Sequence, residues 1–232
     1  MPTALPSPPP SPPLSRRRAA EVLGSFFLFA AVIGSGVMAE ALAGGNIAVA
    51  LIGNTLATGA MLFVLITIFG PVSGAHFNPA VTLVMAARRA LAWRDTLPYL
   101  AAQLGGGLLG ALAAHFMFGL PLFQLGLKAR AGPGQFMGEF IATFGLLLTI
   151  LGTVRHRPAW VAPAVALYIV AGYWFTSSTS FANPAITLIR SLTTSFAGIA
   201  PRDVPLFIVA QLLGAAAAAL LAPLLFPDEP TA

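Results

Sequence analysis

The sequence predicts an all-α membrane protein, built as an inverted repeat of six transmembrane helices plus two re-entrant half-helices. Three observations support this fold class. Of the 232 residues, 57% are hydrophobic and only 8% are charged, which excludes an ordinary soluble domain. Six apolar segments are long enough to cross a bilayer. The hexapeptide NPAVTL at residues 78–83 returns as NPAITL at residues 183–188, which indicates a duplicated unit.

The N-terminal residues are predicted to form a tail. Residues 1–15 are rich in Pro and Ser and have no apolar periodicity, so we expect a disordered, cytoplasmic, Pro-rich tail over residues 1–17. Three arginines at 16–18 precede the first apolar segment, a pattern that a signal peptide also shows. Because that segment has the length of a membrane-spanning helix, we predict a helix that the protein retains.

The six long apolar segments fall into two sets of three, at residues 19–39, 47–69 and 96–118 and at residues 135–153, 160–176 and 204–224. Glu21 in the first set corresponds to Glu139 in the second, and Gln103 corresponds to Gln211. Because three helices are an odd number, the second set must enter the membrane from the opposite face. We therefore predict one domain over residues 18–226, with repeats at 18–120 and 133–226, and a C-terminal tail at 227–232.

Each Asn-Pro-Ala motif is predicted to begin a short helix. Asn is a preferred N-cap residue, and Pro at the first helical position gives up an amide that would be unpaired anyway. The apolar runs that follow, residues 79–88 and 184–194, are only about ten residues long and too short to span a bilayer. We expect two half-helices whose N-terminal ends face a shared point inside the membrane.

The basic residues divide unevenly between the two predicted faces. With the N-terminus inside, the cytoplasmic segments hold Arg16, Arg17, Arg18, Arg88, Arg89, Arg94, Arg155 and Arg157. The opposite face holds Lys128, Arg130 and Arg202, with Arg190 on the second half-helix. This bias predicts that both termini are cytoplasmic. Because no basic patch interleaves with aromatic residues, we expect no nucleic-acid partner.

The residues around the two motifs predict a path through the membrane. The Asn78 and Asn183 amides would present hydrogen-bond donors where the half-helices meet, at a point that repels cations. The backbone before each motif must run extended at membrane depth, which is tolerated only where it is buried in protein or lines a wet cavity. Its carbonyls are expected to form a ladder of acceptors, at Gly74, Ala75 and His76 and at Thr179, Ser180 and Phe181.

The segment SGAHFNPAVTL, the second NPA and the paired Glu and Gln residues resemble the aquaporin (major intrinsic protein) family over residues 18–224. The resemblance implies a homotetramer among membrane lipids with a pore in each subunit. The pore motifs would be Asn78, Pro79 and Ala80 and Asn183, Pro184 and Ala185. It also implies that Glu21 and Glu139 hold the pore loops by accepting hydrogen bonds from their backbone amides; a proton relay through these carboxylates is the alternative.

One position departs from the family pattern. Most members place an Arg directly after the second NPA, at the narrowest constriction, and here that position is Ile186. The family's other three filter positions, carried over by their distance from the Asn-Pro-Ala motifs, fall on Thr58, Ala171 and Ser180. Loss of a guanidinium and of aromatic rings would widen the filter and remove donors, so we expect passage of neutral solutes larger than water.

The segment SFANPAITLIRSLTTSFAGIAP is most similar to bacterial aquaglyceroporins encoded beside arsenic-resistance genes. That resemblance implies water, glycerol-like polyols, arsenite and methylated arsenicals as solutes, and a bacterial cytoplasmic membrane as the location.

Arg190 raises a separate hypothesis. It lies four residues after Ile186, so on a helix it would sit about 6 Å further toward the outer mouth on nearly the same face. Its charge would then favour the arrival of acidic solutes. The alternative is an arginine that reaches the membrane interface or pairs between subunits.

Two other function classes compete with a passive channel. A proton- or ion-coupled secondary transporter is the rival, because inverted repeats with broken helices also build transporters. Coupling needs intramembrane carboxylates near the substrate, and only Glu21 and Glu139 qualify, in symmetric positions that favour a scaffold. An enzyme is not expected, since three scattered His and no Cys provide neither a nucleophile nor a metal site, and no cofactor is implied.

Overall fold

The computed structural model describes residues 12–227, and this range contains helices, connecting loops and no strand. The α-helices are α1 (Leu14–Leu42), α2 (Ile47–Ser73), α3 (Pro79–Ala87), α4 (Trp93–Met117), α5 (Pro133–His156), α6 (Val161–Phe175), α7 (Pro184–Arg190) and α8 (Val204–Leu225). Single turns of 3₁₀-helix precede α6 (η1, Pro158–Trp160) and α8 (η2, Pro201–Asp203). Within the described range, six helices are long and apolar enough to cross a membrane, which confirms the predicted fold class.

The first helix begins earlier than the sequence predicted. Leu14 starts α1 directly after Pro13, so residues 14–17 are helical and the tail predicted over 1–17 is wrong at its C-terminal end. One cause is a contact with α4, because Nη2 of Arg17 lies 2.8 Å from Oδ2 of Asp95. The remaining parts of the two predicted tails, residues 1–11 and 228–232, lie outside the described residues.

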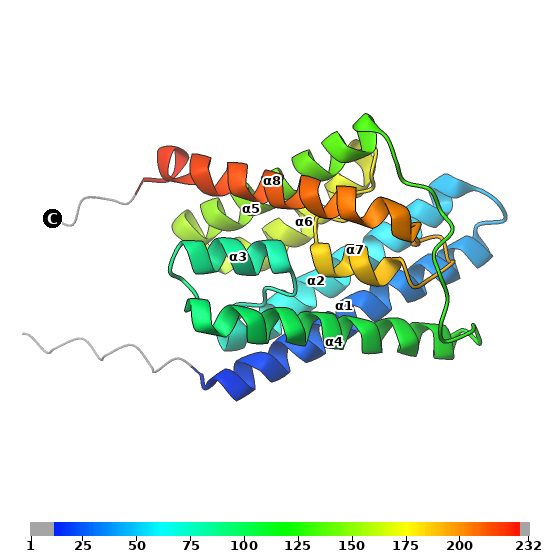
Figure 1. Ribbon diagram of the computed structural model, residues 1–232, viewed down its shortest axis with the longest axis horizontal. Helices are drawn as coiled ribbons and strands as arrows, with labels where there is room; N and C mark the ends of the chain where they lie inside the picture. The colour runs from blue at the N-terminus through cyan, green and yellow to red at the C-terminus, as the bar shows by residue number, and fades with distance from the viewer. Residues whose placement is uncertain (1–11, 228–232) are drawn as a thin grey trace, which may run out of the picture.

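The two repeats pack their helices in the same pairs. α1 packs against α4 and α2, and α5 packs against α8 and α6. The closest approaches occur at glycines: a Cβ on Gly106 would lie 2.2 Å from Val22 O, and one on Gly214 would lie 2.4 Å from Phe140 O. Small residues allow this backbone-to-backbone packing, which is a usual means of helix association in lipid. The start of α1 and the end of α8 lie at the same end of the bundle (Figure 1).

The two half-helices lie end to end between the long helices (Figure 1). Both begin at the predicted Asn-Pro pair. The second, α7, ends at Arg190, four residues before the predicted end at 194. From Arg190 onward the backbone bonds to more distant partners: Arg190 O accepts from Ile199 N at 3.2 Å, and Thr194 N donates to Gln124 Oε1 at 3.0 Å. These contacts with more distant loop residues end the helix early.

Candidate functional site

The two Asn-Pro-Ala motifs are joined by reciprocal hydrogen bonds. Asn78 Nδ2 donates to Ala182 O at 2.7 Å, and Asn183 Nδ2 donates to Phe77 O at 2.8 Å. Each side-chain oxygen also caps its own half-helix, because it accepts from the amide two residues later. An Asn amide carries two N–H groups, so one on each side chain keeps no partner among the described residues. Both Asn residues line a cavity.

Each motif is preceded by backbone amides that bond to a buried glutamate. Glu21 accepts from His76 N at 3.0 Å and Phe77 N at 2.8 Å. In the other repeat, Glu139 accepts from Phe181 N at 2.8 Å and Ala182 N at 2.9 Å. Neither carboxylate is exposed. The charge of each is therefore compensated by donors from the segment that leads into the half-helix.

A glutamine and a threonine complete each glutamate site. Gln103 Nε2 donates to Glu21 Oε2 at 2.8 Å and to Thr82 Oγ1 at 2.9 Å. The other repeat has the same arrangement: Gln211 Nε2 lies 2.6 Å from Glu139 Oε2 and 2.7 Å from Thr187 Oγ1. The threonines, which sequence analysis did not single out, then donate to the carbonyls of Asn78 and Asn183. The sequence does mark these threonines, because both repeated hexapeptides have Thr at the fifth position.

The backbone before each motif is not the extended run that the sequence predicted. Several non-glycine residues have positive φ, namely Ala75 (51°), Phe77 (49°), Thr179 (63°), Ser180 (49°) and Ala182 (48°). Such conformations cost on the order of 1–3 kcal/mol each and persist only when their surroundings enforce them. Here the enforcing groups are the two carboxylates, because left-handed residues turn successive N–H groups toward one anion.

A cavity of about 120 Å³ runs between the two repeats. Its wall includes Gly74, Ala75, His76, Ser180 and Phe181 of the predicted carbonyl ladder, while Thr179 does not line it. Within the described residues, no hydrogen bond ends on the carbonyl of any of the six predicted ladder residues. The carbonyl oxygens of the five residues that line the cavity are therefore free to accept hydrogen bonds from a molecule in it.

Three of the four predicted filter residues lie in this wall: Thr58, Ser180 and Ile186. Ala171 does not, because its side chain is exposed on the outer face of α6, so its assignment to the filter is wrong. Tyr173 lines the cavity instead, with its hydroxyl 3.4 Å from Thr58 Oγ1. Each residue of an α-helix is rotated by about 100° from the one before it, so Ala171 and Tyr173, two positions apart, point in nearly opposite directions.

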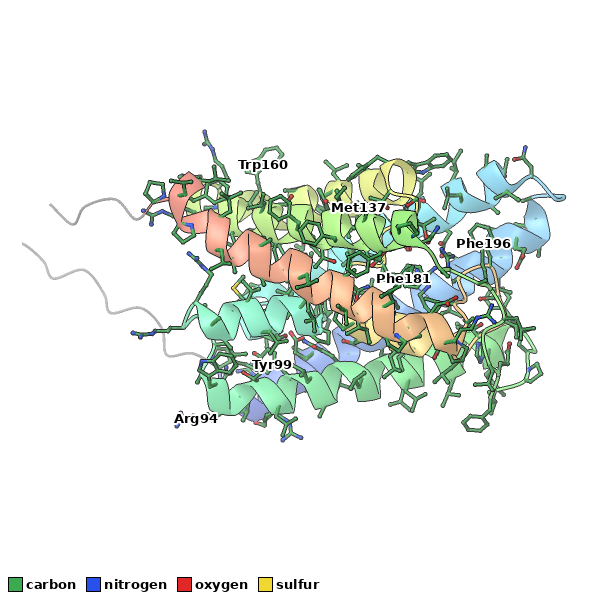
Figure 2. The ribbon with its side chains drawn as sticks, turned by 45° about the horizontal axis from the view of Figure 1, so that its top comes forward. Arg94, Tyr99, Met137, Trp160, Phe181 and Phe196 are labelled. Atoms are coloured by element: carbon green, nitrogen blue, oxygen red, sulfur yellow. The ribbon has the colours of Figure 1, made fainter. Side chains whose placement is uncertain are left out.

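Arg190 also lines the cavity, and its side chain is 2% exposed. Nε donates to Ala197 O, and the guanidinium carbon lies 3.4 Å from the centroid of the Phe181 ring. The alternative interpretation, an arginine that reaches the membrane interface, is therefore wrong. Phe181 itself lies among the helices, between the ends of the molecule marked by Arg94 and Phe196 (Figure 2).

A second buried arginine was missed by the sequence analysis. Arg130 Nε donates to Gly198 O at 3.0 Å, and Nη1 donates to Ser178 O at 3.1 Å. Its guanidinium carbon lies 4.8 Å from the Phe181 ring centroid. Burial lowers the Arg130 pKa to about 10, so it stays charged at neutral pH. Arg130 follows no motif in its irregular loop, and nothing in the sequence marks it.

The chain is similar to known proteins over most of its length. The family model described as "Major intrinsic protein" matches residues 10–169. Aquaglyceroporin AqpS of Rhizobium meliloti is 53% identical over 94% of this chain and 93% of its own length. Aquaporin NIP1-1 of rice, Oryza sativa, is 32% identical over 90% of this chain and 74% of its own length. The crystal structure of the aquaglyceroporin from Plasmodium falciparum matches in fold, with a TM-score of 0.69 at 20% identity over 90% of this chain and 95% of that chain.

Proposed function

Because the chain belongs to the major intrinsic protein family, we propose that the cavity between its repeats is a conduction path for small uncharged solutes larger than water. The chain is an integral membrane protein with six apolar helices in its described range, a passive small-solute channel and not an enzyme.

The observation that carries the proposal is the position of Ile186. This residue directly follows the second Asn-Pro-Ala motif, and its side chain lies in the cavity wall with Thr58 and Ser180. An aliphatic side chain there supplies neither charge nor donors, so solutes such as glycerol or arsenite in its neutral form As(OH)₃ meet no ionic barrier at this point. Tyr173 replaces Ala171 as the fourth member of the proposed filter.

The remaining site residues are proposed to act on solute oxygens and hydroxyls. The free N–H groups of Asn78 and Asn183 would donate at the meeting point of the half-helices, and the unbonded carbonyls of the ladder would accept. Glu21 and Glu139 are proposed to hold the pore loops. Because backbone amides and glutamines already occupy both carboxylates, neither is placed to relay protons or couple an ion to transport.

We further propose a homotetramer surrounded by lipid, in a bacterial cytoplasmic membrane with both termini inside. Large apolar side chains cover the outside of the bundle, including Trp160 and Met137 (Figure 2), which are 63% and 53% exposed. Lipid or neighbouring subunits would bury them. The bacterial origin of the relative named AqpS supports the location. Native mass spectrometry in detergent would test the tetramer.

The filter proposal is tested in proteoliposomes by light scattering under glycerol and arsenite gradients. Wild-type protein should admit both solutes, and Ile186→Arg should reduce their entry by at least about tenfold, since a guanidinium fills and charges the constriction. Ile186→Leu conserves side-chain volume and polarity and should behave like wild type. Rapid water flux without solute entry in the wild type would contradict the proposed filter.

A further inference from the structure

The cavity wall contains a cation one turn beyond Ile186. Arg190 follows it by four residues on α7, which places the two residues on nearly the same helix face and about 6 Å apart along the axis. Both line the cavity, and both are buried in the protein. The family position for a filter arginine is therefore aliphatic here, yet a guanidinium lies close by in the same wall.

The guanidinium of Arg190 is held at Nε and against an aromatic ring. Nε donates to Ala197 O, and the flat group lies over the Phe181 ring. Phe181 is itself fixed by an edge contact with Phe207, with 5.2 Å between ring centroids. Within the described residues the Arg190 side chain forms no ion pair, and the Tyr173 side chain is its other hydrogen-bonding neighbour in the cavity wall. A guanidinium carries five N–H donors, more than these contacts use, so donors of Arg190 remain for a molecule in the cavity.

The neighbouring charges do not neutralise this arginine. Arg130, over the same ring, adds a second positive charge. Glu139, the acid whose charge acts on Arg190, already accepts from two backbone amides and Gln211. A buried charge without a partner is costly, and an aliphatic side chain would fill the same space at lower cost. Simple packing therefore does not explain an arginine at this position.

We propose that Arg190 is a specificity-determining residue of the conduction path: it repels cations and donates Nη hydrogen bonds to solute oxygens, while Ile186 leaves the constriction open. The inference rests on the proposed conduction path. In most family members one filter arginine supplies both the narrow constriction and the positive charge. Here Ile186 sets the width of the constriction, and Arg190 supplies the charge one helical turn away. The pore would then admit wide neutral solutes and still exclude K⁺ and Na⁺.

The test compares two fluxes in the same proteoliposomes, glycerol entry by light scattering and K⁺ leak by a fluorescent indicator. Arg190→Gln removes the charge and should raise the ratio of K⁺ leak to glycerol entry by at least about tenfold. Arg190→Lys keeps the charge and should leak like wild type. Arg202→Gln is the matched control, because its side chain is 77% exposed and it removes the same charge outside the cavity.

A double variant that moves the arginine from position 190 to position 186 provides a second test. The double variant Ile186→Arg/Arg190→Gln should regain low K⁺ leak but lose glycerol entry, since the guanidinium now fills the constriction. Unchanged K⁺ leak in an Arg190→Gln protein that conducts glycerol would overturn the role of Arg190 alone. No glycerol entry through the wild type would overturn the conduction path itself. If Arg190→Gln and Arg190→Met both fail to fold while Arg190→Lys folds, Arg190 is structural and the proposal is wrong.

Discussion

Asn78 and Asn183 each donate a hydrogen bond to the carbonyl of the residue before the other, at 2.7 Å and 2.8 Å. These two bonds tie the half-helices of the two repeats together, although the residues are far apart in the sequence. Each Asn is at once an N-cap acceptor for its own helix and a donor to the opposite segment. An amide is the side chain that performs both roles, because it carries a donor and an acceptor on one carbon.

This double role predicts a specific defect in Asn78→Asp. A carboxylate still caps α3 but cannot donate to Ala182 O, which leaves a buried carbonyl unpaired and places an anion at the centre of the cavity. We expect a loss of about 1–3 kcal/mol in the free energy of unfolding. Thermal unfolding in detergent measures the change. Asn46→Asp is the control, because Asn46 caps α2 at an exposed position without donating across the protein.

The closest helix contacts give a prediction about packing. A Cβ on Gly106 would lie 2.2 Å from Val22 O of α1, whereas one on Gly105 would meet nothing within 4 Å. Gly106→Ala must therefore push α1 from α4, with an expected cost of about 1–3 kcal/mol. Gly105→Ala adds the same methyl group to the adjacent residue and should leave the melting temperature the same or slightly higher. Equal melting temperatures for the two variants would contradict the close packing of these helices.

The fold was predictable to the extent that it depends on hydropathy and the repeat. Six long apolar runs and two Asn-Pro starts located each α-helix found within residues 12–227, because lipid requires long apolar helices and because Asn and Pro are strong local start signals. Helix ends were less accurate. The early end of α7 depends on Gln124 and Ile199, which are distant in the sequence.

The site was predictable where a residue lies within the repeated motif and unpredictable where a loop or helix rotation places it. The two glutamates came from the symmetry of the repeats. Tyr173 was missed because spacing measured across a loop does not fix the rotation of α6. Arg130 was missed because tertiary contacts alone bring its loop to Phe181.

The corrected filter makes opposite predictions for two residues of α6. Tyr173 lines the cavity, so Tyr173→Ala should widen the path and raise glycerol entry by about twofold or more. Ala171 is exposed on the outer face, so Ala171→Tyr should leave glycerol entry unchanged. Both are measured by light scattering in proteoliposomes at equal protein density. A loss of flux in Ala171→Tyr with no change in Tyr173→Ala would restore the original assignment by spacing.

The surroundings of Lys128, in the loop that joins α4 to α5, predict that its ammonium group loses its proton near physiological pH. Its Nζ lies 4.4 Å from the centroid of the Phe196 ring. Burial of the ammonium, together with the charges of Arg130 and Arg190, lowers the Lys128 pKa from 10.5 to about 8. Because the unfolded chain binds this proton more tightly, the contribution of Lys128 to stability rises with pH between about 8 and 10.5.

Lys128 is the single lysine of the sequence, so its titration can be observed directly. Reductive ¹³C-methylation labels its amine, and the shift of that NMR signal should change with a midpoint near pH 8. Lys128→Arg identifies the signal by removing it and leaves that of the α-amino group. Arg130→Gln should move the midpoint upward, because it removes one of the repelling charges. A midpoint near 10.5 in the wild type would show that the ammonium is fully solvated and that the charges of Arg130 and Arg190 do not act on it.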